Sequence, residues 1–356
     1  MGGDHAPESV LYGAAEALTR HAGLHFRLFG DEARIAPILE ALPSLKEAST
    51  LHHTARVIAS DEQPSVALRK GKDSSMRLAI DCVHAGDAAA VVSAGNTGAL
   101  MAMAKIVFRT LPGIDRPAIA SFFPTEGGKC VFLDMGANIE CDAKHLFQFA
   151  IMGDAFARAV LGLENPKIGL LNVGEEDMKG HEAVKEAAAM LKNPDLSLNF
   201  CGFIEGDDIA AGTVDVVVTD GFTGNIVIKT AEGVARMLAH KAKAALKHSL
   251  LAKLGLLLAL PAIRRIKDHL NPSRYNGAMF LGLNGIAVKS HGGTDSEGFA
   301  NAIGVAVEIA MHGLNRKIIE ELQSTNGGIV ANGNGSSNGS SNSSPTDPDT
   351  SGLVLA

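Results

Sequence analysis

The sequence has few aromatic residues: it contains no Trp and only two Tyr, and aromatics make up 4% of its 356 residues. Proteins that bind bare nucleobases usually stack them on aromatic side chains, and nucleic-acid-binding proteins generally carry a basic surface. This chain has a formal net charge of −7. The composition therefore argues against a general polyanion binder, and we expect no nucleic-acid partner.

Cysteine is also scarce and widely spaced. The four residues Cys82, Cys130, Cys141 and Cys201 form no C-x-x-C pair, so the sequence indicates neither a redox motif nor a compact zinc site. We predict four small buried thiols in a reducing compartment and no metal site.

Long apolar runs are missing. None reaches the roughly 18 residues that a membrane span needs. The first residues, 1–7 (MGGDHAP), lack the basic and apolar regions of a secretory signal. The sequence therefore predicts a cytoplasmic protein that at most rests on a membrane surface.

The chain does have a large apolar content, 46% of its residues, and abundant Gly, with 39 residues. From His25 to Gln323, apolar runs of strand length alternate with segments of helical period. This alternation predicts an α/β fold with a mainly parallel sheet and helices on both faces. We expect strands at 88–93, 167–172 and 214–219 and helices at 96–108, around 184–191 and from about 224.

Two segments depart from this alternation. Residues 122–129 (FFPTEGGK) join two apolar runs by a Gly-Gly turn, which predicts a hairpin and hence a mixed sheet. Residues 324–356 are rich in Asn, Gly and Ser and contain no Lys or Arg, which is typical of a disordered low-complexity tail. We therefore predict one α/β domain at 1–323, with a helical excursion around 240–275, and a tail at 324–356.

Gly-rich polar loops follow five of the apolar runs. In open α/β sheets, ligands bind beyond the carboxyl ends of the strands, where Gly lets the backbone approach and helix N-termini offer N–H groups to anions. Each loop alone could be only a tight turn, but five loops converging on one edge predict an anion site. The loops are 93–98 (SAGNTG), 134–138 (DMGAN), 172–176 (NVGEE), 219–225 (TDGFTGN) and 290–295 (SHGGTD).

These loops and three further motifs resemble the acyl-acyl carrier protein:phosphate acyltransferase family of phospholipid synthesis. The further motifs are 1–7 (MGGDHAP), 72–77 (KDSSMR) and 113–118 (GIDRPA). The resemblance implies a Rossmann-like fold related to isopropylmalate and isocitrate dehydrogenases and to phosphotransacetylase. It further implies a homodimer that transfers a long-chain acyl group from acyl carrier protein to inorganic phosphate, without a cofactor. In this family the first motif follows a short apolar strand, so we expect such a strand immediately before Met1.

Phosphate would itself be the nucleophile, so the reaction needs no acylated Ser or Cys. It needs a phosphate cradle, a donor to the thioester oxygen and a charge near the departing thiolate. Partly from the resemblance, we assign Lys179 as the cation and Asn225 as the neutral donor. The candidate substrate-binding residues are Gly3, Asp4, His5, Ser93, Gly95, Asn96, Thr97, Gly98, Arg116, Asp134, Asn138, Asp220 and His291.

Simpler interpretations stay open for each of these residues. Lys179 follows three acidic residues and could be a solvated loop residue that offsets them. Asn225 could cap the helix after Gly224, and the other Asp, Asn and Arg candidates could be capping or turn residues. Gly-flanked His5 and His291 could transfer protons, but with 13 His residues such placements also arise by chance.

The segment 254–260 (LGLLLAL) is apolar on all sides and ends at Pro261. The basic residues Lys247, Lys253, Arg264, Arg265 and Lys267 flank it. An apolar tip with basic flanks can dip into an anionic membrane surface, and the resemblance favours this because the product would pass to a membrane acyltransferase. A helix buried in a dimer interface is the alternative, and the basic flanks with Arg274 could instead meet the acidic carrier protein.

Two rival functions remain. A metal- and nicotinamide-dependent decarboxylating dehydrogenase would use the same fold, but the sequence shows no well-placed G-x-G-x-x-G and no convincing acidic cluster. A non-catalytic acyl-carrier or lipid-binding scaffold would not need Lys179, Asn225 and the Gly-rich loops.

Overall fold

The structure is a computed structural model that describes residues 1–247, 261, 271–330 and 354–355. Within these residues, eleven strands form one sheet in the order β2-β1-β11-β3-β10-β9-β4-β5-β8-β6-β7. The strands are β1 His25–Gly30, β2 Ser49–His53, β3 Ala90–Ser93, β4 Ala118–Thr125, β5 Gly128–Leu133, β6 Lys167–Leu171, β7 Asn199–Ile204, β8 Val216–Val218, β9 Ala278–Leu281, β10 Ile286–Lys289 and β11 Val354–Leu355.

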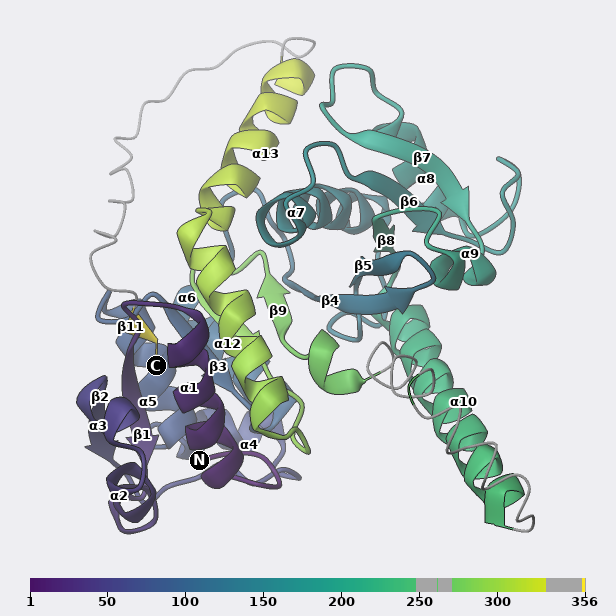
Figure 1. Cartoon of the computed structure of the whole chain (residues 1–356). Coiled ribbons are helices and arrows are strands. Elements are labelled where there is room, and N and C mark those ends of the chain that lie inside the picture. The colour runs from purple at the N-terminus through teal and green to yellow at the C-terminus, as the bar shows by residue number, and fades with distance from the viewer. Residues whose placement is uncertain (248–260, 262–270, 331–353, 356) are drawn as a thin grey trace.

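Helices connect most of these strands and lie on both faces of the sheet (Figure 1). They are α1 Glu8–Arg20, α2 Glu32–Glu40, α3 Pro43–Glu47, α4 Pro64–Lys70, α5 Ser75–His84, α6 Thr97–Phe108, α7 Ala143–Leu161, α8 Glu182–Leu191, α9 Gly206–Ala211, α10 Gly221–Lys247, the 3₁₀ helix η1 Pro272–Tyr275, α12 Ser296–Met311 and α13 Leu314–Val330. The mixed, mainly parallel α/β fold expected from the sequence is confirmed.

Alternate residues along the strands fill cores on opposite faces of the sheet, because successive side chains of a strand point to opposite sides. In β5, Val131 and Leu133 belong to the core that contains α7, whereas Cys130 and Phe132 belong to the one that contains Ile209 of α9. The same division separates the core around α5 and α6 from that around α1 and α12. Burial on both faces explains why the strands read as continuous apolar runs.

The predicted hairpin is present. β4 and β5 pair antiparallel from Thr125 opposite Gly128 to Ala120 opposite Leu133. The other predicted elements are found within a few residues of their expected bounds; for example, α10 begins at Gly221, three residues before the expected start. Helix α13 continues to Val330, so helix extends past the predicted start of the tail at 324.

The prediction that all five Gly-rich loops meet at one edge is wrong. β10 pairs antiparallel with β9, β9 with β4, and β4 with β5, so β10 and β5 run in opposite directions. β3 runs with β10, and β8 and β6 run with β5. The loops after β3 and β10 therefore form one group, and those after β5, β6 and β8 form another. A run of consecutive motifs cannot reveal this reversal, because it depends on the pairing of β4 with β9.

Not all four cysteines are buried. Cys82 and Cys130 are, whereas Cys141 is half-buried and Cys201 lies exposed on β7 at the edge of the sheet. The predicted membrane tip, 254–260, lies outside the described residues. Among the helices that the structure describes, none is long and apolar enough to cross a membrane.

Candidate active site

The first group of loops is organised around Asp134, which follows β5 and is fully buried. Its carboxylate accepts hydrogen bonds from the backbone N–H groups of Ile119, Gly136, Ala137 and Asn138, at 3.0, 3.2, 3.0 and 2.7 Å. The side-chain amide of Asn138 donates to it as well, at 2.9 Å. Burial raises the pKa of the Asp134 carboxyl, and these donors oppose that effect. Both side chains support the loop through these bonds, and their assignment as substrate-binding residues stays a prediction.

The start of α10 is fastened to this loop. Asp220 caps the helix by accepting from the backbone N–H and the hydroxyl of Thr223, at 2.8 and 2.9 Å. The N–H of Gly221 donates to the carbonyl of Asn138, at 2.7 Å. Asp220 is thus a capping residue, one of the simpler roles considered for it. Its bonds fix the direction in which the first turn of α10 faces.

Asn225 lies in the second turn of α10 and not at its cap, so the capping alternative for this residue is wrong. Its side chain is exposed and lies beside Gly136, where an added Cβ would sit 3.5 Å from the Asn225 Cβ. The φ of Gly136 is +128°, a conformation that other residues rarely adopt. Gly136 therefore keeps the space beside the Asn225 amide open.

Lys179 lies in the loop that follows β6. The side-chain amide of Asn172 closes this loop by donating to the carbonyls of Gly174 and Lys179, at 3.1 and 3.0 Å. The exposed Lys179 ammonium pairs with Glu176 at 2.8 Å, and that hydrogen bond raises the pKa of Lys179. Because β6 and β8 are paired up to Leu170 opposite Val218, the Lys179 loop and the start of α10 leave adjacent strands. The cation is charged and accessible.

Arg116 lies at the rim of the same group of loops. It is exposed, and its guanidinium donates to the carbonyl of Glu140 at 3.4 Å.

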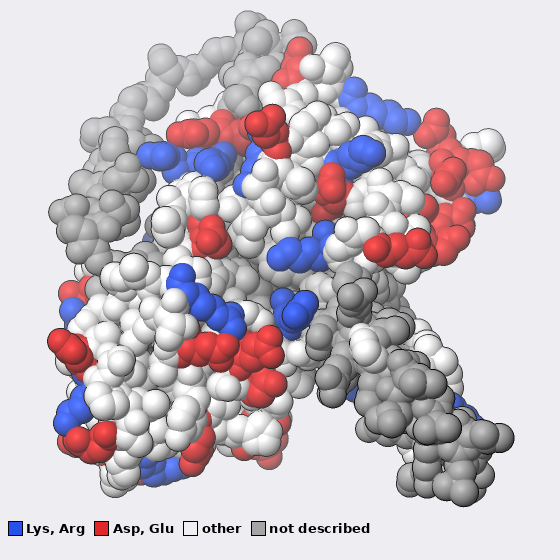
Figure 2. Space-filling model, viewed as in Figure 1, with Lys and Arg blue, Asp and Glu red and all other residues white. Residues whose placement is uncertain are grey.

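Acidic residues are numerous around the Lys179 loop, where Glu175, Glu176 and Asp177 are exposed. Figure 2 shows Asp and Glu side chains along this edge of the molecule, and side chains of both signs over the rest of the face.

The second group of loops joins the N-terminal segment to the ends of β3 and β10. The N–H of Asp4 donates to the carbonyl of Gly292 at 2.8 Å. Gly2 packs on Gly95, so closely that a Cβ added to Gly2 would lie 2.6 Å from the Gly95 Cα. Here the loops border a cleft of about 440 Å³. The predicted residues Gly3, Asp4, Gly95, Asn96 and Thr97 all line it.

Asn96 has a supporting role in this cleft. Its side-chain oxygen accepts from the N–H of Ala99 at 3.0 Å and so caps α6, while its amide donates to the carbonyls of Ala59, Ser60 and Glu62, at 3.2, 3.0 and 2.9 Å. The amide is therefore committed to the protein. Thr97 is exposed at the first position of α6, so it is better placed to meet a ligand.

The remaining predicted residues lie around this second group. The Ser93 hydroxyl accepts from the N–H of Gly95 at 3.2 Å and so fixes the turn, and Gly98 packs closely on Pro64. His5 and His291 are both exposed. One ring nitrogen of His291 is occupied, because its Nδ1 accepts from the N–H of Gly293 at 3.2 Å.

Two charged residues of the cleft were missing from the predicted site, Arg34 and Lys289. Arg34 belongs to α2, and no motif marked it. Lys289 is charged and ends an otherwise apolar strand, a signal that the sequence did carry. In the described parts of the chain, no three His, Cys, Asp or Glu residues come together so as to hold a metal ion.

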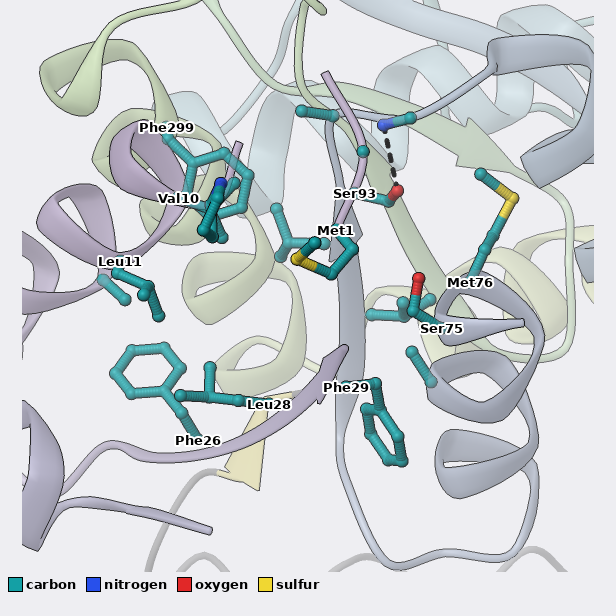
Figure 3. A pocket seen from close by; sticks show the side chains of 18 of the residues that line it. Met1, Val10, Leu11, Phe26, Leu28, Phe29, Ser75, Met76, Ser93 and Phe299 are labelled. Atoms are coloured by element: carbon teal, nitrogen blue, oxygen red, sulfur yellow. Dashed lines mark hydrogen bonds between the residues drawn. The ribbon is translucent and has the colours of Figure 1, made fainter. Parts of the chain in front are cut away.

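An apolar pocket of about 90 Å³ lies between β1 and β3 (Figure 3) and shares Met1, Gly2 and Gly95 with the lining of the cleft. Met1, Leu28, Phe29 and Met76 project around it, and the hydroxyls of Ser75 and Ser93 lie near it. β11 pairs with the first residues of β1 and β3 only, so the pocket lies beyond β11 between the rest of these strands. Its lining does not suit an anion.

The sheet and the loops at its strand ends define an α/β fold that is also found in phosphotransacylases. A branched-chain phosphotransacylase from Enterococcus faecalis V583 is similar to the chain with a TM-score of 0.52 and 15% sequence identity, over 86% of this chain and 96% of that one. This likeness concerns the fold alone.

The chain belongs to the family described as "Fatty acid synthesis protein", which matches residues 1–317. It is 61% identical to a phosphate acyltransferase of Rhodospirillum centenum over 90% of this chain and 91% of that protein. It is 56% identical to a phosphate acyltransferase of Paramagnetospirillum magneticum over 90% of this chain and 92% of that protein. The family suggested by the motifs is thereby confirmed.

Proposed function

We propose that this protein transfers a long-chain fatty acyl group from acyl carrier protein to inorganic phosphate and so makes acyl phosphate for phospholipid synthesis. The observation that carries this proposal is the match of residues 1–317 to the family, together with relatives named phosphate acyltransferase at 61% and 56% identity. The site supports it with exposed Lys179 and Asn225 at the ends of neighbouring strands, and with a polar cleft bounded by Gly-rich loops.

In the proposed reaction, a phosphate oxygen attacks the carbonyl carbon of the thioester. The new C–O bond forms, the carbonyl oxygen becomes an oxyanion, and the C–S bond then breaks to release the carrier thiolate, which takes up a proton. Lys179 would stabilise negative charge on the oxyanion or the sulfur, and Asn225 would donate to phosphate or to the carbonyl oxygen. Lys179 must exchange its hydrogen bond with Glu176 for one with substrate. An exposed ion pair permits that exchange at little cost.

The proposal extends to the partners. Acyl carrier protein as donor and a membrane acyltransferase as acceptor of the product are consistent with a fatty acid synthesis family. A homodimer is supported by α10, which extends away from the sheet (Figure 1) and exposes Val234, Met237 and Leu238. Exposed apolar patches of this kind mark interaction surfaces. Peripheral membrane binding rests on the sequence of 254–260.

The decisive experiment follows thioester consumption with and without phosphate. Purified protein is mixed with a long-chain acyl thioester of acyl carrier protein, the released thiol is measured, and acyl phosphate is sought by ³¹P NMR. We expect thiol release and acyl phosphate in equal amounts, and only when phosphate is present. The same acyl chain on coenzyme A tests the choice of donor. Thiol release that ignores phosphate would contradict the proposal.

The two rival functions give different outcomes in the same preparation. A scaffold would bind the acylated carrier without consuming the thioester. A decarboxylating dehydrogenase would change the absorbance of a nicotinamide cofactor when a divalent metal and a hydroxy acid are supplied.

A further inference from the structure

Lys289 is a buried cation in the cleft between the two strand-end loops and the N-terminal segment. It ends β10, and only 8% of its surface is exposed. Its ammonium donates to the carbonyl of Ala94 at 3.4 Å and to that of Ser290. No carboxylate lies within ion-pair distance of it among the residues that the structure describes. Its hydrogen bonds are to neutral groups, so its charge is not balanced by direct contact.

A charge in this position destabilises the folded protein, because the ammonium loses hydration on burial and has no directly paired opposite charge. Burial lowers the pKa of Lys289 to about 8, and the charge of Asp4 opposes that effect. The amine is thus still mostly protonated at neutral pH. An anionic ligand in the cleft would supply the missing negative charge.

Asp4 lines the same cleft. Its carboxylate is exposed, and it borders the turn at Gly292 and Gly293, where added Cβ atoms would lie 3.9 and 3.2 Å from its oxygens. The cleft therefore presents a buried cation, a carboxylate and the exposed first residue of α6, Thr97. Arg34 also lines it, and its guanidinium donates to the carbonyl of Ala6 at 2.9 Å. A simple anion would be repelled by the carboxylate. An anion that carries its own proton would be able to use it.

We propose that Lys289 and Asp4 form a binding pair that selects hydrogen phosphate. Lys289 donates to a phosphate oxygen, and Asp4 accepts a hydrogen bond from the hydroxyl of the phosphate. Near neutral pH inorganic phosphate retains a proton, whereas sulfate, of the same shape and size, has none. A sulfate oxygen would therefore face a carboxylate oxygen of Asp4 with no hydrogen between them. Leaving such groups unpaired is a strong source of discrimination. This inference rests on the proposed function: it assigns the selection of phosphate to the second group of loops, and the action on the thioester stays with Lys179 and Asn225 of the first group.

The test compares the binding of inorganic phosphate and of sulfate to the purified full-length protein by isothermal titration calorimetry near neutral pH. We expect the dissociation constant of wild type for phosphate to be roughly ten-fold or more below that for sulfate. A ten-fold ratio corresponds to about 1.4 kcal/mol of binding free energy. Asp4→Asn should bring the two dissociation constants to within about two-fold, because an amide can donate to either anion. Lys289→Gln should weaken both anions by about ten-fold or more, because a charge-assisted bond is lost.

Lys129→Gln is the matched control. Lys129 is exposed, but desolvation lowers its pKa as it does that of Lys289, and it lies on β5, separated from β10 by β9 and β4. This variant should bind both anions as wild type does. Equal affinity of wild type for the two anions, or an unchanged preference in Asp4→Asn, would overturn the selection. Unchanged affinity in Lys289→Gln would overturn the role of the lysine.

If Lys289→Gln does not fold, a crystal structure of wild type grown with inorganic phosphate decides the point. Phosphate within hydrogen-bond distance of the Lys289 Nζ and the Asp4 carboxylate supports the pair, and phosphate bound elsewhere contradicts it. These measurements need no acyl donor. The protein could bind phosphate at this pair and yet fail to consume thioesters in a phosphate-dependent way. That result would contradict the proposed function and support this inference.

Discussion

Gly224 of α10 packs directly on the backbone of Asp134, so that a Cβ at position 224 would overlap the Asp134 carbonyl oxygen. This contact joins the helix that carries Asn225 to the loop that follows β5. Backbone atoms cannot move away as the tip of a flexible side chain can. The absence of a side chain at Gly224 therefore sets how closely two parts of the candidate site approach.

We expect Gly224→Ala to destabilise the protein by about 1 to 3 kcal/mol, because the added methyl overpacks a rigid contact. The free energy of unfolding in urea measures this. Gly233→Ala is the control, since Gly233 lies in the same helix with nothing within 4 Å of an added Cβ. That change should stabilise by up to about 1 kcal/mol, from helix propensity. Equal effects of the two changes would show that the Asp134 contact is not rigid.

Lys179→Ala should leave a folded protein and lower the rate of acyl phosphate formation by about 10²- to 10³-fold, as the loss of one group stabilising an oxyanion typically does. The variant removes an exposed side chain, so its thermal unfolding should match wild type. Lys192→Ala removes a nearby exposed lysine that pairs with Asp177, and it should keep normal turnover. Near-normal turnover of Lys179→Ala would rule out the assigned role.

Asn225→Ala should raise the KM for phosphate or lower kcat by about ten-fold or more. KM rises if the lost donor binds phosphate in the ground state, and kcat falls if it stabilises only the transition state. Steady-state kinetics at varied phosphate separate these two cases. Thr230→Ala, on an exposed position of α10 farther from Gly136, should change neither constant. Wild-type kinetics for Asn225→Ala would remove Asn225 from the mechanism.

Asp154 in α7 should make stability depend on pH. Only 3% of its surface is exposed, it pairs with Arg158 at 2.6 Å, and burial raises its pKa from 3.8 to about 6. The folded protein therefore holds this proton to a higher pH than the unfolded chain does. Lowering the pH from 7 through 6 toward 4 should then favour the folded state.

The comparison with Asp154→Asn isolates this effect from the other titrating groups. Relative to that variant, wild type should gain up to about 3 kcal/mol of unfolding free energy as the pH falls from about 7 to about 4. Chemical denaturation at several pH values measures the difference. A difference that does not vary with pH, or that shrinks on acidification, would contradict the predicted shift.

Leu257→Glu tests the predicted membrane tip. If 254–260 enters an anionic bilayer, a charge at its centre must be desolvated, and co-sedimentation with anionic vesicles should be lost. Turnover of a soluble thioester should survive. Aggregation or a change of oligomeric state in the variant, together with no vesicle binding by wild type, would instead indicate that the segment is a buried interface.

The loops that carry Lys179 and Asn225 could be predicted from the sequence because each is a local pattern of Gly and polar residues after an apolar run. The roles of the side chains within them were harder to foresee. Asn96, Asp134 and Asn138 have the composition of ligand-binding residues, yet their polar groups bond to backbone that lies up to 37 residues away in the chain. These partners become neighbours only in the folded chain, so the spacing of residues in the sequence does not predict them.

The sequence by itself determined the α/β class, the hairpin at 122–129 and the positions of the loops, because apolar periodicity and turn residues act over a few neighbours. Tertiary structure alone decided that these loops divide into two groups, since the antiparallel pairings of β9 and β4 reverse the strand direction in the middle of the sheet. It also decided that Lys289 is buried and lines one cleft with Asp4. Burial and strand direction are properties of packing between distant segments, and a linear pattern does not encode them locally.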